Sequence, residues 1–193
     1  MAFTISPVEK KVFSQSVGKV GKSVILWRIF KKIIINQFIM TGFLGEYEAT
    51  LDAKGRFLVP AGFKKQLPVN ETVSFILNRG FEKCLSLYTS ASWEPIFSEL
   101  SKLNDFDPKV RQFKRYFLNG ATQVDPDSAG RILLPKNLME YAGLEKDIVL
   151  VSAIDKIEIW DKTKYQQFFE TFSPEAFSDL AKEVMAGDKT SKS

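Results

Sequence analysis

The sequence predicts an α+β, β-rich fold made of two tandem copies of one small module, each with a short helix and a longer closing helix. Residues 52–60 align without gaps on residues 127–135, at an offset of 75, and such internal repetition indicates a duplicated architecture. Residues 85–88 match residues 157–160 at an offset of 72, so the spacing of the two copies is nearly constant. The 193 residues, 45% apolar and 26% charged, suffice for two small globular domains.

Each copy is expected to begin with a strand, a turn and a second strand. In the first copy these are residues 46–51, the turn Asp52–Arg56 and residues 57–59. Asp suits such a turn because it bonds backbone groups two residues on, and Gly suits it because it adopts positive φ without steric cost. The apolar runs around the turn predict a tight β-arch or a hairpin. The corresponding ranges of the second copy are 121–124, 127–131 and 132–134.

A short helix follows the second strand in each copy. Pro60 and Pro135 open these helices, expected at 61–67 and 136–142, because the fixed φ and missing N–H of Pro suit the first helical position. Gly143 is expected to end the second helix.

Two paired strands and a longer amphipathic helix complete each copy. In the first copy the strands are expected at 72–77 and 85–88, the turn at Asn78-Arg79-Gly80 and the helix at 90–103. In the second copy the strands are expected at 148–152 and 156–160, the turn at Ile154-Asp155-Lys156 and the helix at 162–172. The predicted domains are therefore residues 40–116 and residues 117–175, followed by a C-terminal tail, 176–193, that is polar and disordered after Gly187.

Residues 1–39 differ from the rest of the chain. They carry seven basic residues and one acid, a net charge of +6, whereas the remainder carries −2. Three basic residues interrupt the most apolar stretch, 24–40, so it lacks the ~18 uninterrupted apolar residues of a membrane span. We expect this basic extension to lie outside the fold, with Met40 as the natural first residue; the alternative is a basic amphipathic helix that touches a membrane.

The composition also argues against most enzymes. The chain has no histidine, which removes the commonest general base and every zinc site that needs imidazole, and the single Cys84 rules out an internal disulfide framework. The acidic pairs, such as Asp105 with Asp107, lack further ligands around them. We therefore expect no catalytic residues, no metal, no cofactor and no small-molecule substrate, and a cytoplasmic setting.

The turn that occurs twice, Asp-x-x-Gly-Arg, is the feature most suited to a function. An Arg at the tip of a rigid turn matches the edge of guanine, or a phosphate, with two parallel hydrogen bonds. The alternative is an ordinary turn in which Arg pairs with Asp across the loop, and duplication favours the functional interpretation. The predicted DNA-binding residues are Lys54, Arg56, Arg131 and Lys64, and the predicted turn-forming residues are Asp52, Gly55, Asp127 and Gly130.

These motifs, together with residues 45–60 and the ending Ile159-Trp160-Asp161, resemble the MraZ family of regulators of the bacterial division and cell wall gene cluster. The resemblance extends from Met40 to the C-terminus. It implies AbrB-like swapped-hairpin (double-ψ-type) modules and a ring-shaped homo-oligomer, an octamer or a dodecamer. It also implies a nucleoid-associated repressor that binds repeated boxes in double-stranded promoter DNA. Because Ala129 stands where the first turn has Lys54, we expect Arg56 to contribute most to binding and Arg131 to come second.

Other basic residues and other functions remain open. Lys64 and Lys65 can reach phosphates or form a solvated helix face. The cluster Lys109–Arg115 is interleaved with aromatic residues, which we interpret mainly as core or subunit contacts, with nucleic-acid stacking as the alternative. A ring-forming interaction module that binds no DNA is the second hypothesis, and it predicts that Arg56 and Arg131 are buried and paired.

Overall fold

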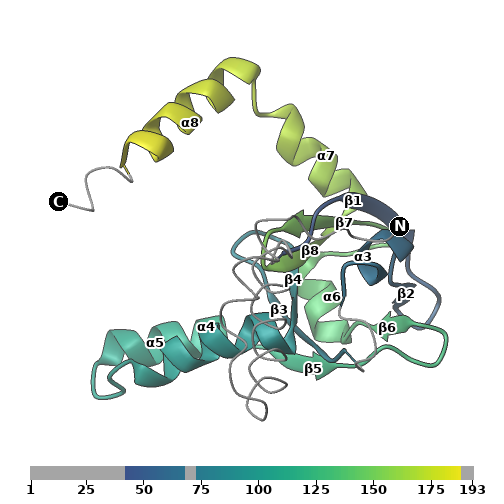
Figure 1. The fold of residues 1–193 in the computed structure, drawn as a ribbon, viewed down its shortest axis with the longest axis horizontal. Helices are drawn as coiled ribbons and strands as arrows, with labels where there is room; N and C mark the ends of the chain where they lie inside the picture. The colour runs from purple at the N-terminus through teal and green to yellow at the C-terminus, as the bar shows by residue number, and fades with distance from the viewer. Residues whose placement is uncertain (1–41, 68–72, 188–193) are drawn as a thin grey trace, which may run out of the picture. The chain divides into compact units, whose positions relative to one another are not determined.

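The computed structural model describes residues 42–67 and 73–187 (Figure 1). The extension expected at 1–39 and the polar end after Gly187 lie outside the described residues. In the described ranges, no helix has the length and apolar character needed to cross a membrane.

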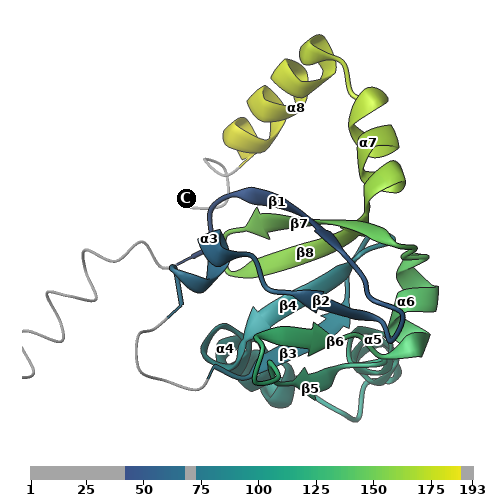
Figure 2. The ribbon, with the colours of Figure 1, turned by 90° about the vertical axis from the view of Figure 1, so that its right-hand side faces the viewer.

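The fold is α+β, as predicted, with antiparallel sheets and six described helices. One sheet has six strands in the order β1-β7-β8-β4-β3-β5, and a second has two, β2 and β6 (Figure 2). The strands are β1 (Glu46–Thr50), β2 (Arg56–Leu58), β3 (Phe75–Arg79), β4 (Leu85–Thr89), β5 (Thr122–Val124), β6 (Arg131–Leu133), β7 (Asp147–Ala153) and β8 (Lys156–Asp161). The helices are α3 (Ala61–Lys64), α4 (Ser90–Lys102), α5 (Pro108–Phe117), α6 (Lys136–Ala142), α7 (Lys162–Glu170) and α8 (Pro174–Gly187).

The two halves of the chain exchange strands. β1, from the first half, pairs with β7 of the second half, and β5, from the second half, pairs with β3 of the first. Within the described ranges, β2 and β6 pair only with each other. Strands β1 and β2 therefore form an arch between two sheets, and the alternative of a hairpin is wrong, because each strand takes its hydrogen bonds from the other half.

The register shows an internal two-fold relation between the halves. Phe57 lies opposite Ile132, its equivalent in the repeat, and Ser86 lies opposite Glu158, which is also its equivalent. Equivalent residues can face one another in an antiparallel pair only where a two-fold axis passes between them. The duplicated sequence is thus folded as two interlocked copies around one axis.

One apolar core joins both sheets and both halves. Side chains alternate between the two faces of a strand, so one face of each strand turns inward. Phe57 and Ile132 point into the core from the two-stranded sheet and are 1% and 0% exposed. The six-stranded sheet and the short helices supply the remaining large, fully buried side chains of the core, among them Phe63, Phe75, Leu77, Leu85, Leu87, Leu138, Ile148, Leu150, Ile157 and Ile159.

The closing helices begin at equivalent residues. The hydroxyl of Thr89 accepts a hydrogen bond from Ser92 N at 3.1 Å, and Asp161 Oδ1 accepts one from Thr163 N at 3.1 Å. Both side chains satisfy N–H groups that a helix leaves without partners at its start. The end of α6 is also as predicted, since Gly143 adopts φ +57° as its C-cap.

Two helices and one turn differ from the prediction. Helices α5 and α8 were not predicted, and α8 occupies 176–187 of the segment expected as a tail. Strand β3 continues through Asn78 and Arg79, and the turn follows it, closed by a hydrogen bond from Gly80 N to Cys84 O at 2.9 Å. Asn78 stays in the strand because it is 1% exposed and its amide donates to Phe117 O at 2.8 Å.

Replacing Phe57 by Ala should destabilise the fold strongly. The change leaves a cavity at the two-fold axis, and such Phe→Ala changes cost about 3–5 kcal/mol of unfolding free energy. The neighbouring Leu58 is 54% exposed, so Leu58→Ala should change stability by less than about 0.5 kcal/mol. Urea unfolding of both variants checks this contrast, and equal losses would contradict the assignment of Phe57 to the shared core.

Candidate nucleic-acid interface

The first turn is closed around the carboxylate of Asp52. Asp52 Oδ1 accepts hydrogen bonds from Lys54 N at 2.9 Å and from Arg56 N at 3.0 Å. Asp52 Oδ2 accepts from Arg56 Nε at 2.7 Å and lies 2.7 Å from Arg56 Nη2. Gly55 has φ +78° and donates its N–H to Asp52 O at 2.9 Å, a conformation that favours glycine. The turn thus fixes one edge of the guanidinium.

The second turn has the same geometry. Asp127 Oδ1 accepts from Ala129 N and from Arg131 N, both at 2.9 Å, and Asp127 Oδ2 accepts from Arg131 Nε at 2.9 Å. Arg131 Nη2 lies 2.8 Å from the same Asp127 oxygen, and Gly130 has φ +76°. Both turns therefore have the roles predicted for Asp and Gly.

The ion pairs shift the pKa of the acidic groups. The hydrogen bond from the Arg56 side chain, and then that from Arg56 N–H, lower the pKa of Asp52 to about 2. The corresponding bonds from Arg131 lower the pKa of Asp127 to about 2, and the side-chain bond to Asp127 raises the pKa of Arg131. At neutral pH both turns therefore contain a full carboxylate–guanidinium pair.

Strand exchange places the two turns together. Val59 N donates to Gly130 O at 3.2 Å, and Leu134 N donates to Gly55 O at 3.0 Å, so each turn is bonded to the chain of the other half. Arg56 Nη1 also lies 3.9 Å from Asp127 Oδ2. The two turns and the β2–β6 ribbon form one continuous surface, which we call the twin-turn surface: residues 52–58 and 127–133, with Lys64.

Lys64 reaches the turn of the opposite half. A Cβ placed on Gly130 would lie 2.5 Å from Lys64 Nζ, whereas one placed on Gly55 would lie 2.9 Å from Met139 Sδ. The helix of each half therefore packs beside the turn of the other. Lys64 supplies the second turn with the second cation that Ala129 does not provide, so each turn has two basic side chains beside it.

All eight residues predicted for this site belong to the twin-turn surface. The arginine side chains are neither buried nor fully exposed, at 26% for Arg56 and 38% for Arg131. They are paired with aspartates, as the assembly hypothesis expects, yet they keep an exposed part, as the DNA-binding hypothesis expects. Their DNA-binding role stays a prediction.

The basic cluster at Lys109–Arg115 lies elsewhere, on α5, at the end of the described unit away from β2 and β6 (Figure 1). Lys114 pairs with Asp105 at 2.7 Å, and Arg111 donates to Asp105 O at 2.7 Å, so both hold the loop before α5. Phe117 stacks on Trp93, with ring centroids 5.9 Å apart. Arg111 and Lys114 therefore hold the loop between α4 and α5, and Phe117 packs α5 against α4.

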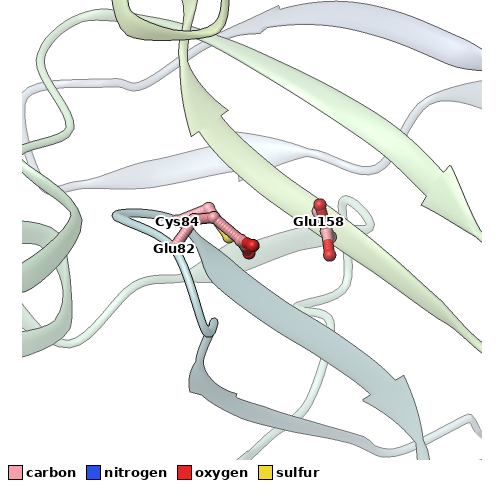
Figure 3. A group of neighbouring side chains, drawn as sticks. All are labelled: Glu82, Cys84 and Glu158. Atoms are coloured by element: carbon pink, nitrogen blue, oxygen red, sulfur yellow. The ribbon is translucent and has the colours of Figure 1, made fainter. Parts of the chain in front are cut away.

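One group in the described part of the chain has the composition of a metal site: the ligand atoms of Glu82, Cys84 and Glu158 lie within 4.8 Å of one another (Figure 3). Burial raises the pKa of the Cys84 thiol to about 12, and the charge of Glu158 adds to the shift, so the thiol is protonated at neutral pH. Glu158 pairs with Lys156 at 3.1 Å and accepts from Trp160 Nε1 at 3.1 Å. The group is explained as a partly buried polar cluster.

These features define a class of protein: a duplicated α+β fold whose halves exchange strands to join two identical turns in one surface. The chain belongs to the MraZ family. Its residues 42–116 and 117–186 each match the family model described as "MraZ protein, putative antitoxin-like".

Curated relatives agree with this assignment. A protein of Christiangramia forsetii is 45% identical over 150 residues, which cover 77% of this chain and 96% of the relative. Proteins of Cytophaga hutchinsonii and Acetivibrio thermocellus are 44% and 39% identical over 147 and 145 residues, or 76% and 75% of this chain and 97% and 99% of the relatives. All three are named transcriptional regulator MraZ.

Acid should remove the contribution of the turn carboxylates to stability. Their folded-state pKa of about 2 lies below the ordinary value of 3.8, so this contribution is present above about pH 4 and is lost as the pH falls toward about 2. Asp127→Asn should therefore be less stable than the parent by a constant amount at neutral pH, and the gap should close in acid. Urea unfolding at several pH values measures it.

Asp179→Asn is the matched control for this measurement, since Asp179 forms an exposed pair with Lys182 on α8 and should contribute little at any pH. An unfolding gap for Asp127→Asn that stays the same at pH 7 and pH 2.5 would contradict the ion-pair assignment.

Proposed function

We propose that this protein is a sequence-specific DNA-binding transcriptional regulator, a repressor of the division and cell wall gene cluster. We further propose that it binds repeated boxes of double-stranded promoter DNA as a ring-shaped homo-oligomer. The observation that carries the proposal is the twin-turn surface, where Arg56 and Arg131 pair with two carboxylates, Lys54 lies in the first turn and Lys64 lies beside Gly130 of the second.

The arginine geometry supports recognition of a polyanion. An arginine side chain has five N–H donors. The Asp of the same turn accepts a hydrogen bond from Nε and lies within ion-pair distance of Nη2, which occupies one edge of the guanidinium. The remaining Nη1 and Nη2 hydrogens can face a guanine or a phosphate, with Arg56 Nη1 also 3.9 Å from Asp127 Oδ2, and the Asp of the same turn holds the guanidinium plane in place before DNA arrives. Local charge is needed because residues 40–193 carry a net charge of −2.

The observed strand exchange supports an AbrB-like swapped-hairpin (double-ψ-type) description of the two modules. In that description the β2–β6 ribbon enters the major groove of DNA, as two-stranded ribbons do in other proteins. The protein would act in the cytoplasm on the nucleoid, without a cofactor, a small-molecule substrate or a catalytic step.

Exposed apolar side chains on the helices support assembly into a ring. On α8, Phe177, Val184 and Met185 are 64%, 61% and 73% exposed, and on α5 Tyr116 is 72% exposed. Apolar surface of this kind on neighbouring residues marks a contact with another protein. The second candidate function, a ring-forming module without DNA binding, is favoured by one observation, the pairing of both arginines with aspartates.

Arg56→Ala should abolish binding to the promoter, and Arg131→Ala should weaken it by a smaller factor. Losing one bidentate base contact costs about 1–3 kcal/mol, and a ring repeats the loss in every subunit that engages a box. Lys64→Ala should weaken binding and lower its salt dependence, whereas Lys65→Ala, on the next residue, should do so less. Salt-controlled titrations against DNA from directly upstream of the gene and against scrambled DNA measure both effects.

Lys109→Ala, on α5, is the control and should change binding little on either DNA. Oligomer size is measured in parallel. If Arg56→Ala binds the promoter as tightly as the parent, or loses its assembly, the turn has a structural role only and the second candidate function replaces the first.

Val184→Asp should shift the protein toward smaller species, because a charge on this exposed apolar residue of α8 opposes its burial in a subunit contact. Glu183→Ser, at the neighbouring exposed residue, should leave the size unchanged. Light scattering at micromolar concentration measures the masses. A parent protein that is strictly monomeric there contradicts the ring.

A further inference from the structure

Two leucines lie exposed on the outer face of the β2–β6 ribbon. Leu58 is 54% exposed and Leu133 is 53% exposed, while their neighbours Phe57 and Ile132 are buried. Leu58 and Leu133 are equivalent residues of the repeat, so the internal two-fold axis relates them. One exposed Leu on a surface needs no explanation, but a two-fold related pair within a proposed binding surface does.

The leucines share their face with the arginines of the twin-turn surface. Leu58 lies opposite Arg131, and Leu133 lies opposite Arg56. In an antiparallel pair such residues point to the same side, and diagonal neighbours on that side are about 7–8 Å apart. Leu58 is also close to the second turn, since a Cβ on Gly130 would lie 3.9 Å from Leu58 Cδ1. On this face leucines and arginines therefore alternate, with each leucine directly opposite an arginine.

A polyanion that presents small apolar groups beside its hydrogen-bonding and charged groups fits this surface. The major groove of DNA presents the 5-methyl group of thymine beside the base edges, and phosphates border it. A second copy of this chain fits less well, because the surface carries four basic side chains and two carboxylates, and a two-fold contact would bring two surfaces of the same net charge together.

We propose that Leu58 and Leu133 contact thymine methyl groups and make the protein prefer thymine at two positions related by a two-fold axis. This proposal rests on the proposed DNA-binding function and names part of what that site recognises. Each methyl group taken out of water contributes about fourfold to affinity, and two leucines acting together contribute about tenfold or more.

The test removes only the methyl groups. Duplex DNA from directly upstream of the gene is prepared with thymine or with uracil, which pairs identically and lacks the 5-methyl group. The parent should bind the thymine duplex about tenfold more tightly than the uracil duplex. The variant Leu58→Ala/Leu133→Ala should bind both duplexes with affinities within about twofold of each other, and this cycle cancels any effect of uracil on DNA stiffness.

Leu58→Met/Leu133→Met keeps an apolar side chain and should keep the preference for thymine. The proposal is overturned if the parent binds both duplexes equally, if the alanine variant keeps the full preference, or if the alanine variant loses its oligomeric state, which would place a second copy on this face. A parent that binds neither duplex more tightly than scrambled DNA overturns the proposed function itself, and this inference with it.

Discussion

The antiparallel pairing of β2 with β6 is the constraint on which the rest of the structure depends. Because Phe57 lies opposite its own equivalent, Ile132, the two halves must be related by a two-fold axis at this point. The strand before each turn then reaches the sheet of the other half, and the two turns end side by side. The buried side chains of the ribbon hold the core together, and its outer side chains form the candidate interface.

Local patterns predicted the elements but not their partners. The apolar runs, the Asp-Gly turns and the prolines place each strand and short helix within a few residues of its observed bounds. The exchange of β1 and β5 between the halves could not be predicted in this way. The apolar pattern of a strand is the same whichever neighbouring strand it pairs with. The sequence does carry a start signal for helix α5: Asp107 is its N-cap, which accepts a hydrogen bond from Lys109 N, and Pro108 stands at its first turn.

In the candidate site, too, the local roles could be predicted from the sequence, whereas the neighbours that strand exchange brings together could not. The roles of Asp52 and Gly55 follow from the geometry that an Asp-x-x-Gly-Arg turn requires, and they were predictable. The place of Lys64 was not, because it depends on strand exchange: its helix belongs to the first half and its ammonium group lies beside Gly130 of the second. Aligned residue by residue, the second turn has one positive charge fewer than the first, because Ala129 stands where the first has Lys54. In the fold, Lys64 provides a positive charge beside the second turn, although it precedes Gly130 by 66 residues.

The aspartates determine what kind of interface this surface can be. Each carboxylate cancels part of the local positive charge, so the surface attracts a polyanion less than four free cations would. Each carboxylate also fixes the guanidinium plane of its arginine, so the arginine side chain loses less conformational entropy when a partner binds. An interface of this kind gains selectivity from geometry rather than from bulk charge, in agreement with a body of the chain that is slightly acidic. On the proposed function, each subunit then contributes a modest affinity, and repetition of the surface around a ring, matched to repeated boxes in the DNA, supplies the remainder.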